Sequence, residues 1–155
     1  MKIIRKTRNF LLLDFFSMLL LSEAFCFLGW ARILKSIPFT RVAPTLGEKM
    51  GETKYKQTKE HVEMIQKVSY AIEVMSKHTC WESKCLVMAI AGMKMLERRK
   101  IESTLYMGVA RETDGKMTAH AWLRSGSIYV SGAAGMERYT VVAKFAKRIN
   151  GVKVI

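Results

Sequence analysis

Hydrophobic residues recur with a helical period over about the first hundred positions of the chain and with a strand period after them. Residues 10–34 form the most apolar run, which predicts a helix packed on the rest of the protein or on a partner. Steps of three and four residues predict an amphipathic helix over about 57–77, with an apolar stripe of Val62, Ile65, Val68, Ile72 and Met75. The same spacing predicts a helix over about 83–99, through Leu86, Ala89, Ile90, Met93 and Leu96.

Past this second helix the alternation of apolar and polar residues predicts an antiparallel meander, with strands over 103–110, 117–124 and 127–131 and a further candidate strand over 139–142. Asp114-Gly115 marks the first hairpin turn, because glycine adopts the positive φ that such turns require. Ser125-Gly126 marks the second. A short basic tail, helical or irregular, is expected over 144–150.

Two starts compete for the helix over 83–99. Thr79 can cap it with Glu82 completing a capping box, or Ser83 can cap it and leave Cys85 in the first turn. Only the second start places the Cys85 sulfur near the unpaired amides and the positive end of the helix dipole, where an anion is stabilised. The expected stabilisation of an anionic Cys85 sulfur favours the helix start at Ser83, whereas the capping box favours the start at Thr79.

Prolines and glycines mark a boundary between two predicted regions. Pro38 and Pro44 bracket a connection that continues through two glycines to residue 53. Residues 1–50 are therefore expected to form an apolar and basic N-terminal helical region, and residues 51–155 the functional domain. A chain of 155 residues, half of them hydrophobic, is long enough for one buried core.

A net charge of +13 predicts attraction to polyanions, acidic peptides or anionic membranes. The basic residues are dispersed and no nucleic-acid-binding motif concentrates them, so nucleic acid is not expected as a partner. Asp14 and Glu23 interrupt the apolar run of residues 10–34, which argues against a spanning helix and leaves shallow membrane contact as the alternative. The chain is expected in the cytoplasm, either free or associated with a membrane.

Three cysteines, Cys26, Cys80 and Cys85, are typical of free thiols in a reducing compartment. Zinc held by Cys80, Cys85, His78 and His120 is an alternative, but the spacing is not that of a metal site, and neither a metal nor a cofactor is expected. Cys85 at a helix start and His120 on a later strand instead match the way papain-like and transglutaminase-like folds assemble a nucleophile and its base. Cys80 is the competing nucleophile.

A two-residue loop at Ser125-Gly126 pairs Leu123 with Ile128 and His120 with Ser131, and it sorts apolar from polar side chains onto separate faces. A three-residue loop would mix the faces. In the favoured register the Ser131 hydroxyl reaches the His120 ring, so Ser131 is the candidate that orients the imidazole.

Three blocks of sequence resemble the lasso-peptide leader peptidases, bacterial members of the transglutaminase-like cysteine protease superfamily. They are residues 81–91, which contain Ser83-Lys84-Cys85-Leu86, residues 105–109, which contain Gly108-Val109, and residues 119–123, which contain His120-Ala121-Trp122. The resemblance covers about residues 58–145, and the blocks stand in the family's order and spacing. It implies an α+β, papain/transglutaminase-like fold, with N-terminal helices and the nucleophile at a helix start packed on an antiparallel sheet.

The resemblance also implies an activity, in which Cys85 attacks the scissile carbonyl and His120 carries the proton. The substrate would be the leader of a ribosomally made precursor, a small recognition protein would present it, and a partner cyclase would then close the ring. Where the family usually has an aspartate on the next strand, this chain has Val130-Ser131-Gly132, so Ser131 or help from elsewhere, such as Asp114, must replace it. The Cys85 backbone amide is the expected oxyanion donor, with Trp81 Nε1 or a main-chain group before it as the second.

Two other functions compete with peptide hydrolysis. A non-catalytic basic scaffold, docked to a membrane or an acidic partner, would not need the Cys85 thiol. Acyl transfer to an amine would use the same pair of residues and differ only in its product.

Overall fold

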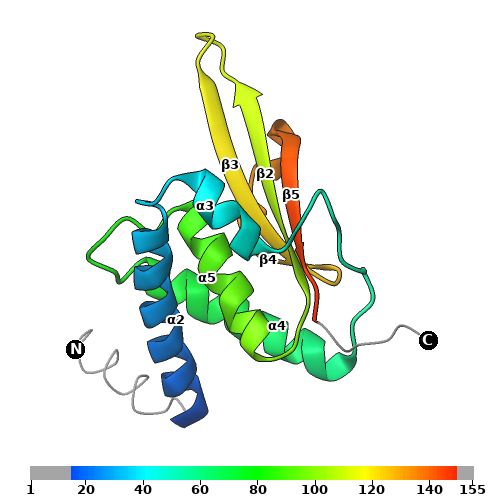
Figure 1. The fold of residues 1–155 in the computed structure, drawn as a ribbon. Helices are drawn as coiled ribbons and strands as arrows, with labels where there is room; N and C mark the ends of the chain where they lie inside the picture. Colours follow the sequence, from blue (N-terminus) through cyan, green and yellow to red (C-terminus); the bar gives the residue numbers. More distant parts are fainter. Residues whose placement is uncertain (1–14, 150–155) are drawn as a thin grey trace.

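Helices cover one face of an antiparallel sheet in the computed structural model, which describes residues 15–149 (Figure 1). The helices are α2 (Phe15–Leu34), α3 (Phe39–Val42), α4 (Lys59–Ser76) and α5 (Cys85–Arg98), with 3-10 turns η1 (Ala43–Leu46) and η2 (Met136–Arg138). The strands are β1 (Glu48–Lys49), β2 (Ser103–Arg111), β3 (Met117–Ser125), β4 (Ile128–Ser131) and β5 (Thr140–Lys147), in the sheet order β1-β5-β2-β3-β4. The α+β class expected from the sequence is confirmed.

The amphipathic helix predicted over 57–77 is α4, and its start has a clear cause. The Thr58 side chain accepts a hydrogen bond from the backbone N–H of His61, at 3.2 Å between Oγ1 and N, and so caps the helix. Its stripe of Ile65, Val68, Ala71 and Ile72 is fully buried. The spacing of apolar residues therefore located this helix to within a few residues.

α5 is the central helix, because α2 and α4 pack on one side of it and the sheet on the other (Figure 1). Gly92 lies where α5 approaches β3: a Cβ there would stand 2.9 Å from Leu123 Cδ2 and 3.4 Å from Val130 Cγ1. The missing side chain lets the helix backbone settle close to the sheet. Leu123, at 0% exposure, then seals the core between the two layers.

α2 belongs to the same core as the helices that follow it. Leu20, Ala24, Leu28 and Ala31 are buried on its inner face. Residues 10–14 of the predicted helix lie outside the described residues. The predicted division at residue 50 stays a prediction, and residues on both sides of that point contribute to one hydrophobic cluster.

Residues 144–147 belong to β5, so the predicted helical or irregular tail is wrong there. β5 runs antiparallel to both β1 and β2, with Phe145 opposite Leu105 and Lys49. Two of its basic side chains reach carboxylates brought from elsewhere in the fold: Lys144 Nζ lies 3.1 Å from Glu52 Oε2 and Lys147 Nζ 3.2 Å from Glu97 Oε1. These partners are distant in sequence, which is why the lysines resembled a solvated tail.

The β3–β4 hairpin turns one residue later than predicted. Gly126 adopts φ +57°, and the paired residues are Ser125 with Ile128, Arg124 with Tyr129 and Leu123 with Ser131. Val130 is an extra residue of β4 that breaks the regular register. The predicted pairs Leu123–Ile128 and His120–Ser131 are therefore wrong.

Phe145→Ala tests the place of β5 in the core. Phe145 is 2% exposed, so the variant is expected to lose about 3–5 kcal/mol of unfolding free energy. Val142→Ala on the same strand, at 55% exposure, is the control and should change stability by less than about 0.5 kcal/mol. Urea denaturation measures both; equal effects of the two substitutions would contradict the burial of β5.

Candidate functional site

Cys85 is the first residue of α5 and is partly exposed. The preceding residue, Lys84, is the N-cap and makes no side-chain capping hydrogen bond. Neither predicted cap is used, because Thr79 Oγ1 and Ser83 Oγ hydrogen-bond each other at 2.8 Å. The prediction that Cys85 lies in the first turn is nevertheless confirmed. The amides of this turn and the positive end of the helix dipole suit an anionic sulfur or a developing oxyanion.

His120 lies on β3, on the face of the sheet that points away from the helices. The β2–β3 ladder is regular along its length, so side chains of β3 alternate strictly between the two faces. Leu123 faces α5, where it meets Gly92. His120 and Trp122 therefore share the opposite face.

On that face the His120 ring is held by three contacts. Its centroid lies 5.8 Å from that of Trp122 and 5.0 Å from that of Tyr139, both in stacked geometry. Its Nε2 lies 2.7 Å from the carbonyl oxygen of Gly132. A carbonyl only accepts, so Nε2 carries the proton, and in the neutral ring Nδ1 holds the lone pair.

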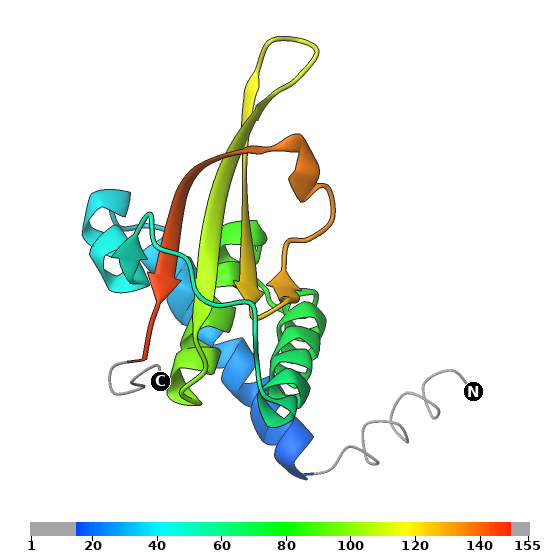
Figure 2. The same cartoon turned by 90° about the vertical axis from the view of Figure 1, so that its right-hand side faces the viewer.

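The chain after β4 runs along the side of β3 and then passes in front of β3 and β2 into β5 (Figure 2). Gly132, at φ +74°, begins this crossing close to β3: a Cβ there would stand 2.4 Å from the Ala121 carbonyl oxygen. Farther along, Tyr139 lies against Gly108 of β2. We call residues 132–139 the far-face strap, since they cover the His120 ring from the side away from the helices.

The His120 ring points to the sheet face opposite the one that packs on α5, whose first residue is Cys85. Cys85 belongs to the helical layer and His120 to the far face of the sheet, and among residues 15–149 no hydrogen bond joins the two side chains. Their catalytic roles stay predictions. Cys80, the competing nucleophile, is exposed in the loop before α5.

The predicted contact between Ser131 and the imidazole is wrong. The bulge in β4 pairs Ser131 with Leu123, and Ser131 Oγ is buried with no hydrogen-bond partner in the described part of the chain. The Gly132 carbonyl oxygen, in place of the Ser131 hydroxyl, forms the hydrogen bond with the imidazole. A main-chain acceptor of this kind has no signature in the sequence.

The other candidates also have separate places. Trp81 Nε1 is buried without a partner among the described residues, and its ring packs on α2, 5.0 Å from the Phe25 ring. Asp114 lies in the exposed β2–β3 turn and accepts a hydrogen bond from the Lys116 amide at 3.0 Å. The His78 ring bonds the Val74 carbonyl, and residues 15–149 contain no group of three or more metal-ligating side chains close enough to hold an ion.

Sequence reasoning missed the polar network that continues this face. Arg124, 1% exposed, donates from Nε to Tyr106 Oη at 2.9 Å, and Tyr106 in turn donates to Glu52. Tyr106 stacks on Trp122 at 5.6 Å between centroids. The network thus reaches the aromatic ring beside His120. The sequence signal that could have revealed this network is the alternation of His120, Trp122 and Arg124, which places all three side chains on one face of β3.

Hydrogen bonding from Tyr106 is the main reason that the pKa of Glu52 falls to about 2, with further bonds from Lys144 and Tyr55. Burial is the main reason that the pKa of Tyr106 rises, and the Glu52 carboxylate raises it further. Arg124 also donates to the Thr53 and Gly126 carbonyls, at 2.9 and 2.6 Å. The segment before α4 is thereby tied to the sheet.

Comparison with known proteins gave one match. A model of the transglutaminase-like superfamily matches residues 25–144, which is most of the chain. The search of curated proteins and the search of solved structures returned no match.

Gly132→Ala and Gly135→Ala form a matched pair that tests the crossing of the strap. Both glycines have nearly the same φ, +74° and +76°, but only Gly132 has backbone within reach of a new Cβ. Gly135→Ala is expected to lose about 1–2 kcal/mol of unfolding free energy from the left-handed backbone alone. Gly132→Ala should lose clearly more in the same denaturation experiment. Equal losses would contradict the close crossing.

The Glu52 network predicts an acid-sensitive contribution to stability. Because the pKa of Glu52 is lowered from 4.5 to about 2 on folding, its contribution is full above pH 4.5 and is lost as the pH falls towards 2. Glu52→Gln should therefore be less stable than the wild type at pH 6, and the difference should shrink at pH 3. Urea denaturation at the two pH values measures this; a constant difference would contradict it.

Proposed function

Because the chain belongs to the transglutaminase-like superfamily, whose members are commonly cysteine proteases and acyltransferases, we propose that it removes the leader from a ribosomally made lasso-peptide precursor. A partner cyclase then closes the ring. The observation that carries the proposal is the position of Cys85: it is a partly exposed thiol at the start of the central helix, with no side chain capping that helix end.

The proposed reaction proceeds in two steps. The Cys85 thiolate attacks the scissile carbonyl, and the Cys85 amide donates to the oxyanion. The C–N bond breaks, the thiol's proton leaves on the amine of the released fragment, and a thioester remains on Cys85. Water then attacks the thioester, which releases the other fragment as a carboxylic acid and restores the thiol.

His120 is the proposed carrier of the proton, and this role has a structural requirement. The ring must reach the helix side of β3, whereas in the described conformation it lies on the far face, bonded to Gly132 and stacked on Tyr139. The proposal therefore includes a rearrangement of this end of β3 when the substrate binds. A small recognition protein that presents the leader is the proposed partner for this step.

A second candidate function is a non-catalytic basic scaffold that docks to a membrane or an acidic partner. The orientation of the His120 ring favours it: the ring bonds the Gly132 carbonyl on the sheet face opposite Leu123, and a scaffold needs no pairing of thiol and imidazole. Acyl transfer to an amine is the remaining variant of the enzymatic proposal, in which an amine replaces water in the second step.

Cys85→Ala, with Cys80→Ala as the matched control, separates these functions. Each variant is incubated with a lasso precursor and its recognition protein, and products are followed by mass spectrometry. Cys85→Ala is expected to lose at least about 10³-fold in cleavage rate because the nucleophile is gone, whereas Cys80→Ala cleaves normally.

His120→Asn tests the proton carrier in the same assay and should also slow cleavage severely. Cleavage by Cys85→Ala at the wild-type rate would overturn the enzymatic proposal. Normal maturation of the precursor in cells by Cys85→Ala, but not by a deletion of the whole chain, would establish the scaffold. A product heavier than the acid by an added amine would identify acyl transfer.

A further inference from the structure

α2 presents an apolar surface that no described part of the chain covers. Its large exposed residues, which we call the outer face of α2, are Phe15, Phe16, Met18, Leu19, Phe25 and Ile33. Exposure reaches 77% for Phe15 and 66% for Ile33. The other exposed residues of the helix, Ser22 and Cys26, are also uncharged, and the two charged residues of α2, Glu23 and Arg32, are only partly exposed.

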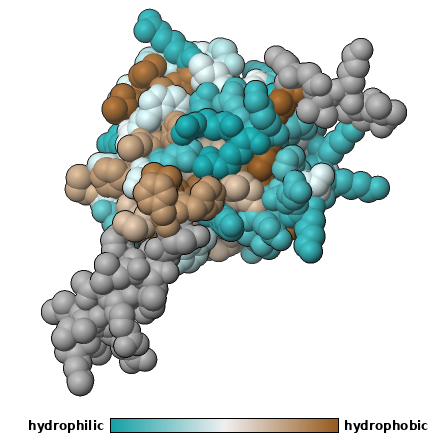
Figure 3. All heavy atoms as spheres, turned by 90° about the horizontal axis from the view of Figure 1, so that it is seen from below, coloured by the Kyte–Doolittle hydropathy of each residue, from teal (hydrophilic) through white to brown (hydrophobic). Residues whose placement is uncertain are grey.

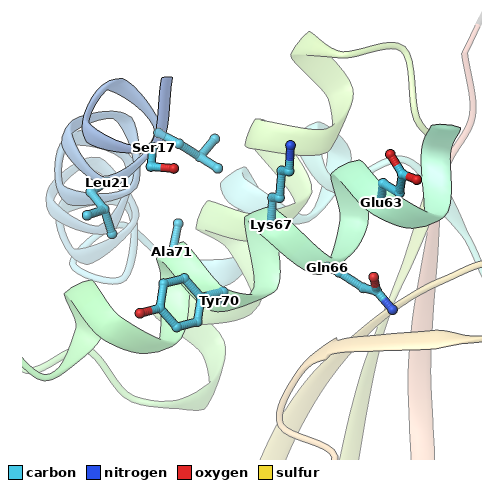
Figure 4. Close-up of a pocket in the computed structure, with 8 residues that line it drawn as sticks. Ser17, Leu21, Glu63, Gln66, Lys67, Tyr70 and Ala71 are labelled. Carbon is cyan, nitrogen blue, oxygen red and sulfur yellow. The ribbon is translucent and has the colours of Figure 1, made fainter. Parts of the chain in front are cut away.

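The apolar surface continues from α2 into a groove beside α4. Leu20, Leu21, Tyr70 and Ala71 form the apolar part of a cleft of about 320 Å³ between the two helices (Figure 4). Its lining is completed by the polar residues Ser17, Glu63, Gln66 and Lys67. The Lys67 ammonium lies 5.3 Å from the centre of the Phe16 ring. Seen from below, the molecule gathers brown, apolar surface in one area with teal, polar surface beside it (Figure 3).

We propose that the outer face of α2 and this cleft dock the protein in the plane of an anionic lipid membrane. An interfacial helix buries its apolar face about 5–10 Å deep, at the boundary of headgroups and acyl chains. The cleft would receive an acyl chain, and Lys67 would meet a lipid phosphate. The proposal does not depend on the proposed enzymatic function.

Charge selects an anionic surface over a second copy of this chain. The net charge is +13, so two copies repel each other, whereas anionic lipid attracts the chain. Four basic residues stand N-terminal to the helix, within the first eight positions of the sequence: Lys2, Arg5, Lys6 and Arg8. The acidic residue of α2, Glu23, is already neutralised, with its oxygens 3.0 Å from Arg98 and 2.6 Å from Arg99.

The composition of the face favours lipid over a protein partner. Protein interfaces are on average about as polar as the rest of a protein surface, whereas the exposed residues of α2 are all uncharged and six of them are large and apolar. Basic side chains instead lie beside aromatic rings of α2, as in Arg98 with Phe27 at 5.8 Å and Lys94 with Trp30 at 5.6 Å. This arrangement lets cations reach headgroups while apolar groups enter the acyl region.

The packing of α2 against the protein core indicates that the helix lies on the membrane and does not cross it. By length and composition α2 is able to cross, with a mean hydropathy of 1.5. Its inner face, however, holds Leu20, Ala24, Leu28 and Ala31 in the protein core. A spanning helix would have to abandon that core, so the docked helix lies in the interface.

Co-sedimentation with vesicles tests the proposal on the full chain. The wild type should bind vesicles of phosphatidylcholine mixed with phosphatidylglycerol, bind them less in high salt, and bind phosphatidylcholine vesicles weakly. Phe15→Ser with Leu19→Ser should weaken binding at least about tenfold. Met117→Ser with Val142→Ser, which removes side chains of 58% and 55% exposure from the strands, is the matched control and should bind normally.

A fluorophore on Cys26 gives a readout that does not depend on those variants folding. Cys26 is exposed between residues of the outer face, and Cys80 and Cys85 are changed to serine so that the label is unique. An environment-sensitive dye there should shift to the blue when mixed vesicles are added, and the same dye on Val142→Cys should not.

Three results of these experiments with vesicles would overturn the proposal, and one result without vesicles would do so too. The three results with vesicles are equal binding by the two double variants, equal binding to both kinds of vesicle, and a Cys26 dye that does not respond to vesicles. A dye already shielded from iodide without vesicles would show that residues 1–14 or a second copy cover the face, which also overturns it.

Discussion

Leu123 of β3 lies against Gly92 of α5, and this contact fixes which face of the sheet the helices cover. β3 pairs regularly with β2, so the position of one side chain decides the face of every other. The odd positions around Leu123 enter the core, and the even ones, including His120, face away. The place of the imidazole in this conformation is thus a consequence of core packing, and the rearrangement that the proposed reaction needs has to change the strand between His120 and the buried Leu123.

Hydrogen-bond acceptors on the far face offset the free-energy cost of burying the charge of Arg124. The Arg124 guanidinium is almost completely buried, and it is accepted there because Tyr106, two backbone carbonyls and Glu52 receive its donors. The Tyr55 ring stacks on the guanidinium, 3.9 Å from its centroid. One chain of contacts runs from this arginine through Tyr106 and Trp122 to His120, so the network that stabilises the sheet also positions the imidazole.

The sequence was sufficient for the helices and the central hairpin, because each follows a local period that packing reinforces: the stripe of α4 and the Asp114-Gly115 turn are examples. It was insufficient where a distant residue decides. Lys144 belongs to a strand because β5 pairs with the distant β2, where its charge also meets Glu52, and Ser131 loses its predicted partner because one extra residue in β4 shifts the register. The Gly132 carbonyl, which accepts a hydrogen bond from His120, is a main-chain group, so the pattern of side chains gives no signal for it.

The loop that leads to Cys85 rests on the helix that carries the exposed apolar face. The Trp81 ring packs on Phe25 and over Gly29, where a Cβ would stand 3.3 Å from the indole. Phe25 belongs to the outer face of α2, so whatever covers that face also touches the wall of this loop. The Trp81 Nε1 donor is buried there without a described partner, and such a donor gains free energy from any rearrangement that supplies an acceptor. One indole ring thus packs the loop before Cys85 against α2.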